Sequence, residues 1–157
     1  MTGEPVNIYE YEALAHERLP KPEYDFIAGG ATDEITLKRT RAVFDAIMLR
    51  PRMLVDISQP SLSTTVLGHQ VAFPILLDPA GNHGRAHGEG ELATARAAGA
   101  MGTVMLLSSG SSYTLEEVAK VATGPIWFQQ YLYRDRGLSK MMAQRAQDAG
   151  YKALCIT

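Results

Sequence analysis

The side chains that could do chemistry are neutral and polar, and they follow apolar runs of the chain. In the run Ile126–Leu132, Trp127, Gln129 and Tyr131 would share one face of a strand, because strand side chains alternate with a period of two. A Gln and a Tyr on a buried strand are costly unless a polar group meets them. The end of this run is therefore interpreted as part of a binding site.

Two other runs end on a hydroxyl. The segments RAAGAMGTVMLLS and RAQDAGYKALCIT each pass from the end of a helix through a glycine into an apolar run, and they finish at Ser108 and Thr157. Barrel enzymes place their chemistry at that end of a strand. The alternative, that both hydroxyls only cap loops, remains open.

A third loop follows the apolar residues 75–77 and contains Pro79, Ala80 and Gly81. Glycine lets the backbone approach a flat or anionic ligand closely, although an ordinary βα turn would have the same composition. Together with Ser108, Gln129 and Thr157, this loop would form a binding site lined by neutral hydrogen-bond donors and acceptors. Such a set suits a flavin ring and supplies neither a nucleophile nor a base.

His83 and His87 raise the possibility of a metal site, with Glu89 and Glu91 close in sequence. Histidines four residues apart can share a metal when one helix holds both, and Gly84 beside a loop argues against such a helix. We expect no metal here. A metal-dependent barrel hydrolase is the weakest of the functional alternatives.

Composition narrows the class of protein. The chain has 157 residues, of which 46% are hydrophobic and 20% charged, as in a soluble globular domain. A net charge of −2 argues against a nucleic-acid partner. The single cysteine, Cys155, excludes a disulfide framework and suits a cytoplasmic setting. No secretion signal or membrane span is expected, since no run of about 18 apolar residues occurs.

Residues 1–74 are predicted to form a helical segment followed by a hairpin at the base of a barrel. Helical spacing and stop signals predict three helices, over Asn7–Arg18, from Pro22 to Ala28, and from Thr32 or Asp33 to Ile47. Gly29 and Gly30 are predicted to end the second helix as residues with a left-handed backbone. Short β-prone pieces from 53 to 74 predict a strand and a hairpin outside the barrel.

From Ile75 onward, strands and helices alternate with a repeat of roughly 25 to 30 residues, the size of one βα step. Crossovers of this kind imply a parallel sheet, so residues 75–157 are predicted to be the first half, about four strands, of an α/β (β/α)8 TIM barrel. The predicted strands are 75–77, Thr103–Leu107, Ile126–Leu132 and Ala153–Thr157. The predicted helices are His87–Met101, one opened by a Thr114–Glu117 capping box, and Asp135–Ala149.

Ordered motifs along essentially the whole chain carry a resemblance. They are Tyr24–Asp25–Phe26 with Gly29–Gly30–Ala31, Phe44–Asp45 through Arg50–Pro51–Arg52, Asp78–Pro79–Ala80–Gly81 followed by Ala86–His87 and Glu89–Gly90–Glu91, Leu107–Ser108–Ser109, Phe128–Gln129 with Tyr131, and Leu154 with Ile156–Thr157. Together they resemble the N-terminal half of the FMN-dependent 2-hydroxy acid oxidases and dehydrogenases, the family of glycolate oxidase and lactate oxidase.

The resemblance implies residue roles. The backbone of Pro79, Ala80 and Gly81 would lie against FMN. The side chains of Ser108, Gln129 and Thr157 would form hydrogen bonds with its ring. Tyr24 and Tyr131 would bind the substrate. Two positions depart from the family pattern. Asp78 stands where relatives usually have a small apolar residue, and Gly110 replaces a residue that is often bulky, which implies a roomier pocket for the substrate side chain.

The family keeps its catalytic histidine base in the half that follows Thr157, so the chain is expected to be an N-terminal fragment without a catalytic residue. The complete protein is expected to be a homo-oligomer that oxidises a small (S)-2-hydroxy acid to a 2-oxo acid by transferring a hydride equivalent to FMN. The fragment alone is expected to be inactive. A half-barrel that binds flavin or a partner without catalysis is the main alternative.

Overall fold

The computed structural model describes residues 4–157, which fall into two compact units. The first unit ends at Gln59 and the second is Pro60–Thr157. The predicted base hairpin lies in the second unit, with the sheet. No helix in the described part of the chain is long and apolar enough to cross a membrane.

In its described residues, 4–59, the first unit contains three helices: α1 (Ile8–Arg18), α2 (Lys21–Ala28) and α3 (Ile35–Asp45). The Asn7 side chain accepts hydrogen bonds from the first backbone N–H groups of α1, which places the start of this helix where the sequence predicts it. Pro22 occupies the first turn of α2, where its missing N–H is not needed.

The predicted left-handed stop at Gly29 and Gly30 is wrong, because Gly29 has an extended backbone with φ −75°. Glycine is required at this position for a different reason. A Cβ on Gly29 would lie 2.7 Å from the Asp25 carbonyl oxygen, which accepts the Gly29 N–H. The left-handed residues are Thr32 and Glu34, and they delay the start of α3 to Ile35.

The predicted hairpin is confirmed, with β1 (Thr64–Val66) antiparallel to β2 (His69–Val71). Its two turn residues, Leu67 and Gly68, both have positive φ, as a type I′ hairpin turn requires. The strand predicted within residues 53–58 is absent from the described structure. Leu54 there has φ 61°, which interrupts an extended run.

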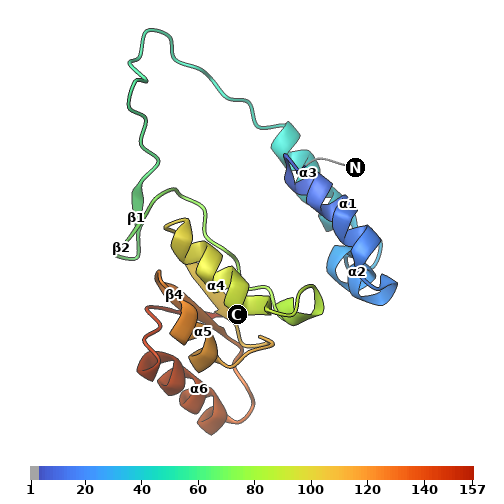
Figure 1. The fold of residues 1–157 in the computed structure, drawn as a ribbon, viewed down its shortest axis with the longest axis vertical. Coiled ribbons are helices and arrows are strands. Elements are labelled where there is room, and N and C mark those ends of the chain that lie inside the picture. The colour runs from blue at the N-terminus through green and yellow to red at the C-terminus, as the bar shows by residue number, and fades with distance from the viewer. Residues whose placement is uncertain (1–3) are drawn as a thin grey trace. The chain divides into compact units, whose positions relative to one another are not determined.

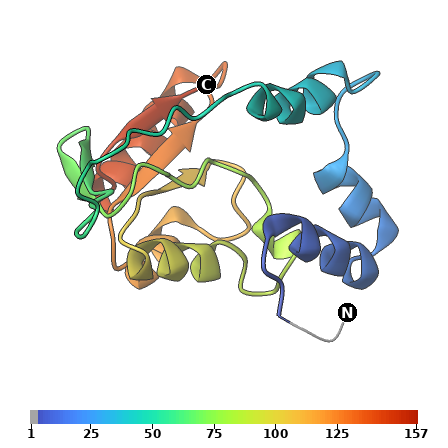
Figure 2. The ribbon, with the colours of Figure 1, turned by 90° about the horizontal axis from the view of Figure 1, so that it is seen from above.

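The second unit contains a parallel sheet in the order β3 (Met105–Ser108), β4 (Ile126–Gln130) and β5 (Leu154–Ile156). Figure 2 shows the sheet with the C-terminus at the end of β5. The predicted strand Ile126–Leu132 is two residues too long. Beyond Gln130 the neighbouring strands no longer offer partners, and the Thr157 N–H donates the last bond to the Gln130 carbonyl.

The strand predicted at 75–77 is reduced to a single parallel bridge between Leu77 and Met105. Two hydrogen bonds flank this bridge, from Leu77 N–H to the Val104 carbonyl and from Leu106 N–H to the Leu77 carbonyl. Pro74 and Pro79 bracket the segment, and a proline has no N–H to give to a ladder. The order along the sheet is therefore Leu77, β3, β4 and β5.

Helices α4 (Gly90–Ala100), α5 (Leu115–Val121) and α6 (Arg136–Asp148) cover one face of this sheet (Figure 1). Their apolar residues pack on Met105, Leu107 and Phe128, which are almost fully buried. The predicted start at His87 is wrong for α4. A short 3-10 turn at 83–85 and Gly90, with φ 42°, postpone the helix to Gly90.

Glycines bring α4 close to the turn before β4. A Cβ on Gly99 would collide with Thr123 Oγ1, and a Cβ on Gly124 would lie 3.1 Å from Gly99 Cα. The backbone of α4 therefore rests directly on the turn at 123–124.

The opposite face of the sheet is closed at one end by the hairpin. Val71 of β2 packs with Val104 and Trp127 in a second, smaller apolar cluster. Ala72 N–H donates to the Gly102 carbonyl at 2.8 Å, which ties the hairpin to the start of β3. The other end of this face carries polar side chains.

Candidate functional site

Ser108, Gln129 and Thr157 come together at the carboxyl ends of three neighbouring parallel strands. Ser108 ends β3 and is paired in register with Gln129 of β4, and Gln129 is paired with Cys155 of β5. Ser108 and Gln129 are 5% and 2% exposed, whereas Thr157 is exposed. Carboxyl ends of parallel strands are where barrel proteins build their sites.

The orientation of the Gln129 amide follows from one obligatory donor. Ser109 N–H lies 3.1 Å from Gln129 Oε1, and a backbone N–H can only donate, so this atom must be the oxygen. Ser108 Oγ donates to the same oxygen at 3.3 Å. The Nε2 group is thereby directed to β5, where it donates to Thr157 Oγ1 at 2.6 Å.

This chain of bonds leaves two protons that are free to be donated. Thr157 Oγ1 accepts from Gln129, so its own O–H can be donated outward. Gln129 Nε2 carries a second hydrogen as well. The row therefore carries neutral donors of the kind that could bind the carbonyl oxygens and ring nitrogens of a ring edge, and its contact with a flavin stays a prediction.

The loop that contains Gly81 borders this row. A Cβ on Gly81 would lie 3.2 Å from the Gly110 carbonyl oxygen and 3.5 Å from Ser108 Oγ, so the two loops approach each other at van der Waals distance. Asn82 N–H donates to the same Gly110 carbonyl at 3.0 Å. At Gly110 itself an added Cβ would meet only Ser108 Oγ, at 3.6 Å, so there is room for a larger side chain.

Glu91 has a role that was not predicted from the sequence, where this carboxylate was weighed as a metal ligand and as part of a family motif. The side chain is 0% exposed, and its Oε1 accepts from His83 N–H at 2.9 Å and from Ser112 N–H at 3.0 Å. Burial alone would raise the pKa of Glu91, but backbone hydrogen bonds from Ser112, His83 and Glu91 itself, together with the charge of His83, outweigh it and lower the pKa. The sequence feature that could have indicated its burial is a glutamate in the first turn of an alanine-rich helix, which packs closely on its neighbours.

The two histidines have separate partners. His83 Nδ1 lies 3.1 Å from Thr94 Oγ1, and His87 Nδ1 accepts from Glu89 N–H at 3.2 Å. Within residues 4–157 no group of three His, Cys, Asp or Glu side chains is arranged to hold a metal ion.

The two tyrosines assigned to substrate lie in different units. Tyr131 follows the end of β4 and is 53% exposed. Tyr24, in α2, donates a long hydrogen bond to Glu12 Oε1 at 3.4 Å and meets the His16 ring edge-on. Desolvation and then the Glu12 charge raise the pKa of Tyr24, so its hydroxyl remains a donor at neutral pH. Their contacts with a substrate stay a prediction.

Comparison with known proteins places this geometry in a family. Residues 15–157 match the FMN-dependent dehydrogenase family. The chain belongs to that family. FMN is the family's cofactor. The neutral donors at the ends of β3, β4 and β5 fit such a group, because a flavin ring edge combines acceptor and donor atoms without a full charge.

The curated relatives are longer than this chain. An L-lactate oxidase from Nostoc sp. is 52% identical over 98% of the chain, which corresponds to 43% of that protein. Glycolate oxidase 1 from Oryza sativa subsp. indica is 46% identical over 99% of the chain and 42% of its own length. The chain thus spans about two fifths of the length of these relatives.

Solved structures agree on the fold. A crystal structure of mandelate oxidase with 3,3-difluoro-2-hydroxy-3-phenylpropionic acid has a TM-score of 0.93 at 36% identity, over 97% of this chain and 46% of that one. A soluble mutant of (S)-mandelate dehydrogenase from Pseudomonas putida has a TM-score of 0.91 at 39% identity, over 96% of this chain and 43% of that one. These relatives are TIM barrels, so the predicted fold class is confirmed.

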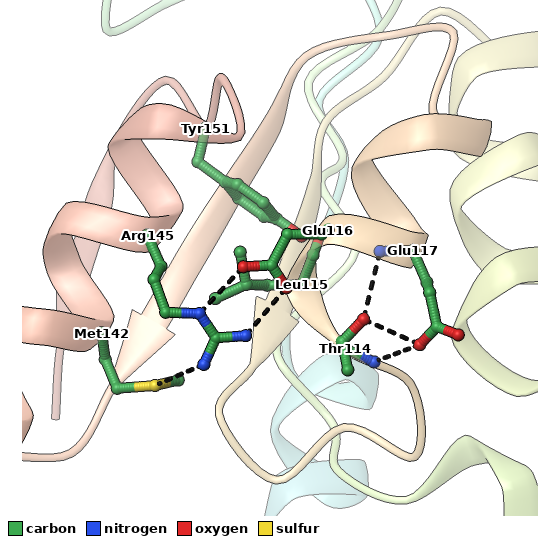
Figure 3. A network of polar contacts seen from close by, with 7 residues as sticks. All are labelled: Thr114, Leu115, Glu116, Glu117, Met142, Arg145 and Tyr151. Carbon is green, nitrogen blue, oxygen red and sulfur yellow. Dashed lines mark hydrogen bonds and ion pairs between the residues drawn. The ribbon is translucent and has the colours of Figure 1, made fainter.

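In this family member, Arg145 of α6 and Tyr151, which follows α6, hold the first turn of α5 (Figure 3). The guanidinium of Arg145 binds both carboxylate oxygens of Glu116, each at 2.8 Å. Tyr151 O–H donates to the Leu115 carbonyl at 2.9 Å. Burial, and then the charge of Glu116, raise the pKa of Tyr151, which keeps this donor protonated.

The predicted capping box at the start of α5 is confirmed (Figure 3). Thr114 Oγ1 accepts from Glu117 N–H at 3.3 Å, and Glu117 Oε2 accepts from Thr114 N–H at 2.8 Å. The box defines where the loop after β3 ends and the helix begins.

We predict that Tyr151→Phe lowers the free energy of unfolding of the full-length protein by about 1 to 3 kcal/mol, because the Leu115 carbonyl would lose its donor in a buried site. Urea unfolding followed by circular dichroism measures this change. Tyr113→Phe is the matched control, since its hydroxyl bonds the Gly88 carbonyl at the surface, where water can replace it. Equal effects of the two substitutions would contradict the assignment.

Proposed function

We propose that the protein that contains this chain is an FMN-dependent oxidoreductase that converts an (S)-2-hydroxy acid to a 2-oxo acid. The observation that supports it most directly is the hydrogen-bonded row of Ser108, Gln129 and Thr157 across three strand ends. Membership of the FMN-dependent dehydrogenase family supports it as well. The names of the relatives point to lactate, glycolate and mandelate as the substrate class.

In this proposal the row holds the edge of the flavin ring, and the backbone of Pro79, Ala80 and Gly81 lies against the ring. Bound FMN would supply the acceptor for a hydride equivalent from the substrate carbon that bears the hydroxyl. The residues described here orient the ring through neutral hydrogen bonds. Thr157 and Gln129 each have a proton to donate, and the close approach of Gly81 to Gly110 fixes the loop beside Ser108.

The decisive test of the cofactor site is Gln129→Leu in the full-length protein. We expect FMN affinity to fall by about 1 to 3 kcal/mol, because the substitution removes an amide donor and leaves polar partners unmet. Fluorescence titration of the apoprotein with FMN measures the affinity. Gln130→Leu is the control, since Gln130 bonds the Ser139 carbonyl on the helix side of the sheet and should change stability without changing FMN affinity. Equal FMN affinities for wild type and Gln129→Leu would refute the proposed site.

Tyr24 and Tyr131 are proposed to bind the carboxylate or hydroxyl of the substrate. We expect Tyr24→Phe and Tyr131→Phe each to lower kcat/KM by roughly tenfold, as one hydrogen bond to a charged substrate is lost, with FMN affinity unchanged. Steady-state kinetics with (S)-lactate and FMN titration separate the two effects. Tyr133→Phe serves as a neighbouring control. Loss of FMN from either variant would reassign that tyrosine to the cofactor.

Gly110 is proposed to leave room for the substrate side chain, because an added Cβ there meets only Ser108 Oγ. We expect Gly110→Trp to lower kcat/KM for (S)-mandelate by at least about tenfold, with a much smaller effect on (S)-lactate, through steric exclusion. Gly110→Ala provides the intermediate size. Equal losses for both substrates would show that position 110 does not discriminate side chains.

The catalytic histidine base is proposed to lie in sequence that follows Thr157, so residues 1–157 produced alone should not bleach FMN with lactate or glycolate. A full-length protein that binds FMN but oxidises no 2-hydroxy acid would favour the non-catalytic alternative. We also propose a cytoplasmic homo-oligomer. Light scattering of the purified full-length protein and cell fractionation test these two points.

A further inference from the structure

Two loops border the proposed flavin site, and they are fastened to each other. The first, residues 78–85, follows Leu77, and the second, residues 109–114, joins β3 to α5. Asn82 N–H donates to the Gly110 carbonyl and Gly84 N–H donates to Ser112 Oγ, both at 3.0 Å. These bonds connect loops that are some 28 residues apart in sequence.

One oxygen atom of Glu91 also connects the two loops. Its Oε1 accepts both the His83 N–H of the first loop and the Ser112 N–H of the second. His83 lies two residues after Gly81, and Ser112 lies three residues after Ser109, whose N–H orients the Gln129 amide. A shift of either N–H group would therefore be transmitted to residues assigned to the flavin.

The burial of this carboxylate is unfavourable unless the two bonds compensate. Glu91 is 0% exposed, and its second oxygen, Oε2, is buried without a hydrogen-bond partner among the described residues. A neutral side chain would be cheaper to bury. What the charge adds is strength in the two N–H···O bonds, because a charged acceptor binds roughly twice as strongly as a neutral one.

We propose that Glu91 is a positioning residue for the flavin site: its carboxylate holds the loops 78–85 and 109–114 in one fixed arrangement and acts on FMN through them. This inference rests on the proposed function, since it concerns loops assigned to the cofactor. It gives Glu91 no contact with FMN or substrate.

The test is Glu91→Gln in the full-length protein, which keeps the size of the side chain and removes its charge. Amide hydrogen exchange should accelerate at residues 82–84 and 110–113. The FMN dissociation constant should rise by about tenfold, the effect of weakening two charge-assisted bonds. The visible circular dichroism of bound flavin should change, since it reports how the ring is held.

Glu89→Gln is the matched control. Glu89 lies two residues earlier, is exposed, and pairs with Arg96 at 2.6 Å outside both loops. The same change of charge there should leave hydrogen exchange in the loops, FMN affinity and flavin circular dichroism as in the wild type.

Ser112→Ala covers the case in which Glu91→Gln does not fold. Ser112 is exposed, and the substitution removes only the acceptor of Gly84 N–H, so it should loosen the same loops and raise the FMN dissociation constant by about threefold. Faster exchange in the loops with unchanged FMN affinity and flavin circular dichroism would show that Glu91 is purely structural and would overturn the inference. A wild-type protein that fails to bind FMN would instead refute the proposed function.

Discussion

The rest of the site depends on the register of the parallel ladder, in which Ser108 pairs with Gln129 and Gln129 with Cys155. A slip by one residue would turn Phe128 toward the site and bury Gln129 against the helices, because strand side chains alternate between faces. Apolar packing opposes such a slip on both sides. Helices α4, α5 and α6 cover the face with Phe128, and the hairpin covers part of the face with Trp127.

Charge and recognition are separated in this molecule. The side chains proposed to bind the ring are neutral, and three charged groups near them hold the structure together. Glu116 and Arg145 join two helices, and Glu91 joins two loops. In the proposed flavin site, neutral hydrogen-bond donors would therefore meet the ring edge, and these three charged groups would not contact it.

Local patterns predicted much of this architecture. Period-two alternation placed Trp127 and Gln129 on one face, the Thr114–Glu117 spacing predicted a capping box, and the order of βα steps predicted the parallel sheet. Two of the errors involve contacts distant in sequence. The end of β4 depends on the lengths of its neighbours, and the burial of Glu91 depends on a loop 21 residues away. Gly29 was predicted for its dihedral freedom, although the contact with the Asp25 carbonyl is what requires it.

The contact between Gly99 and Gly124 fixes the position of the C-terminal end of α4. Gly99 lies eight positions after Glu91, which corresponds to about 12 Å along the helix axis. A methyl group at position 99 would push the C-terminal end of α4 away from the turn at 123–124. The displacement would reach the Glu91 carboxylate at the other end of α4, so the position of the loops proposed to bind flavin depends on a glycine at the far end of this helix.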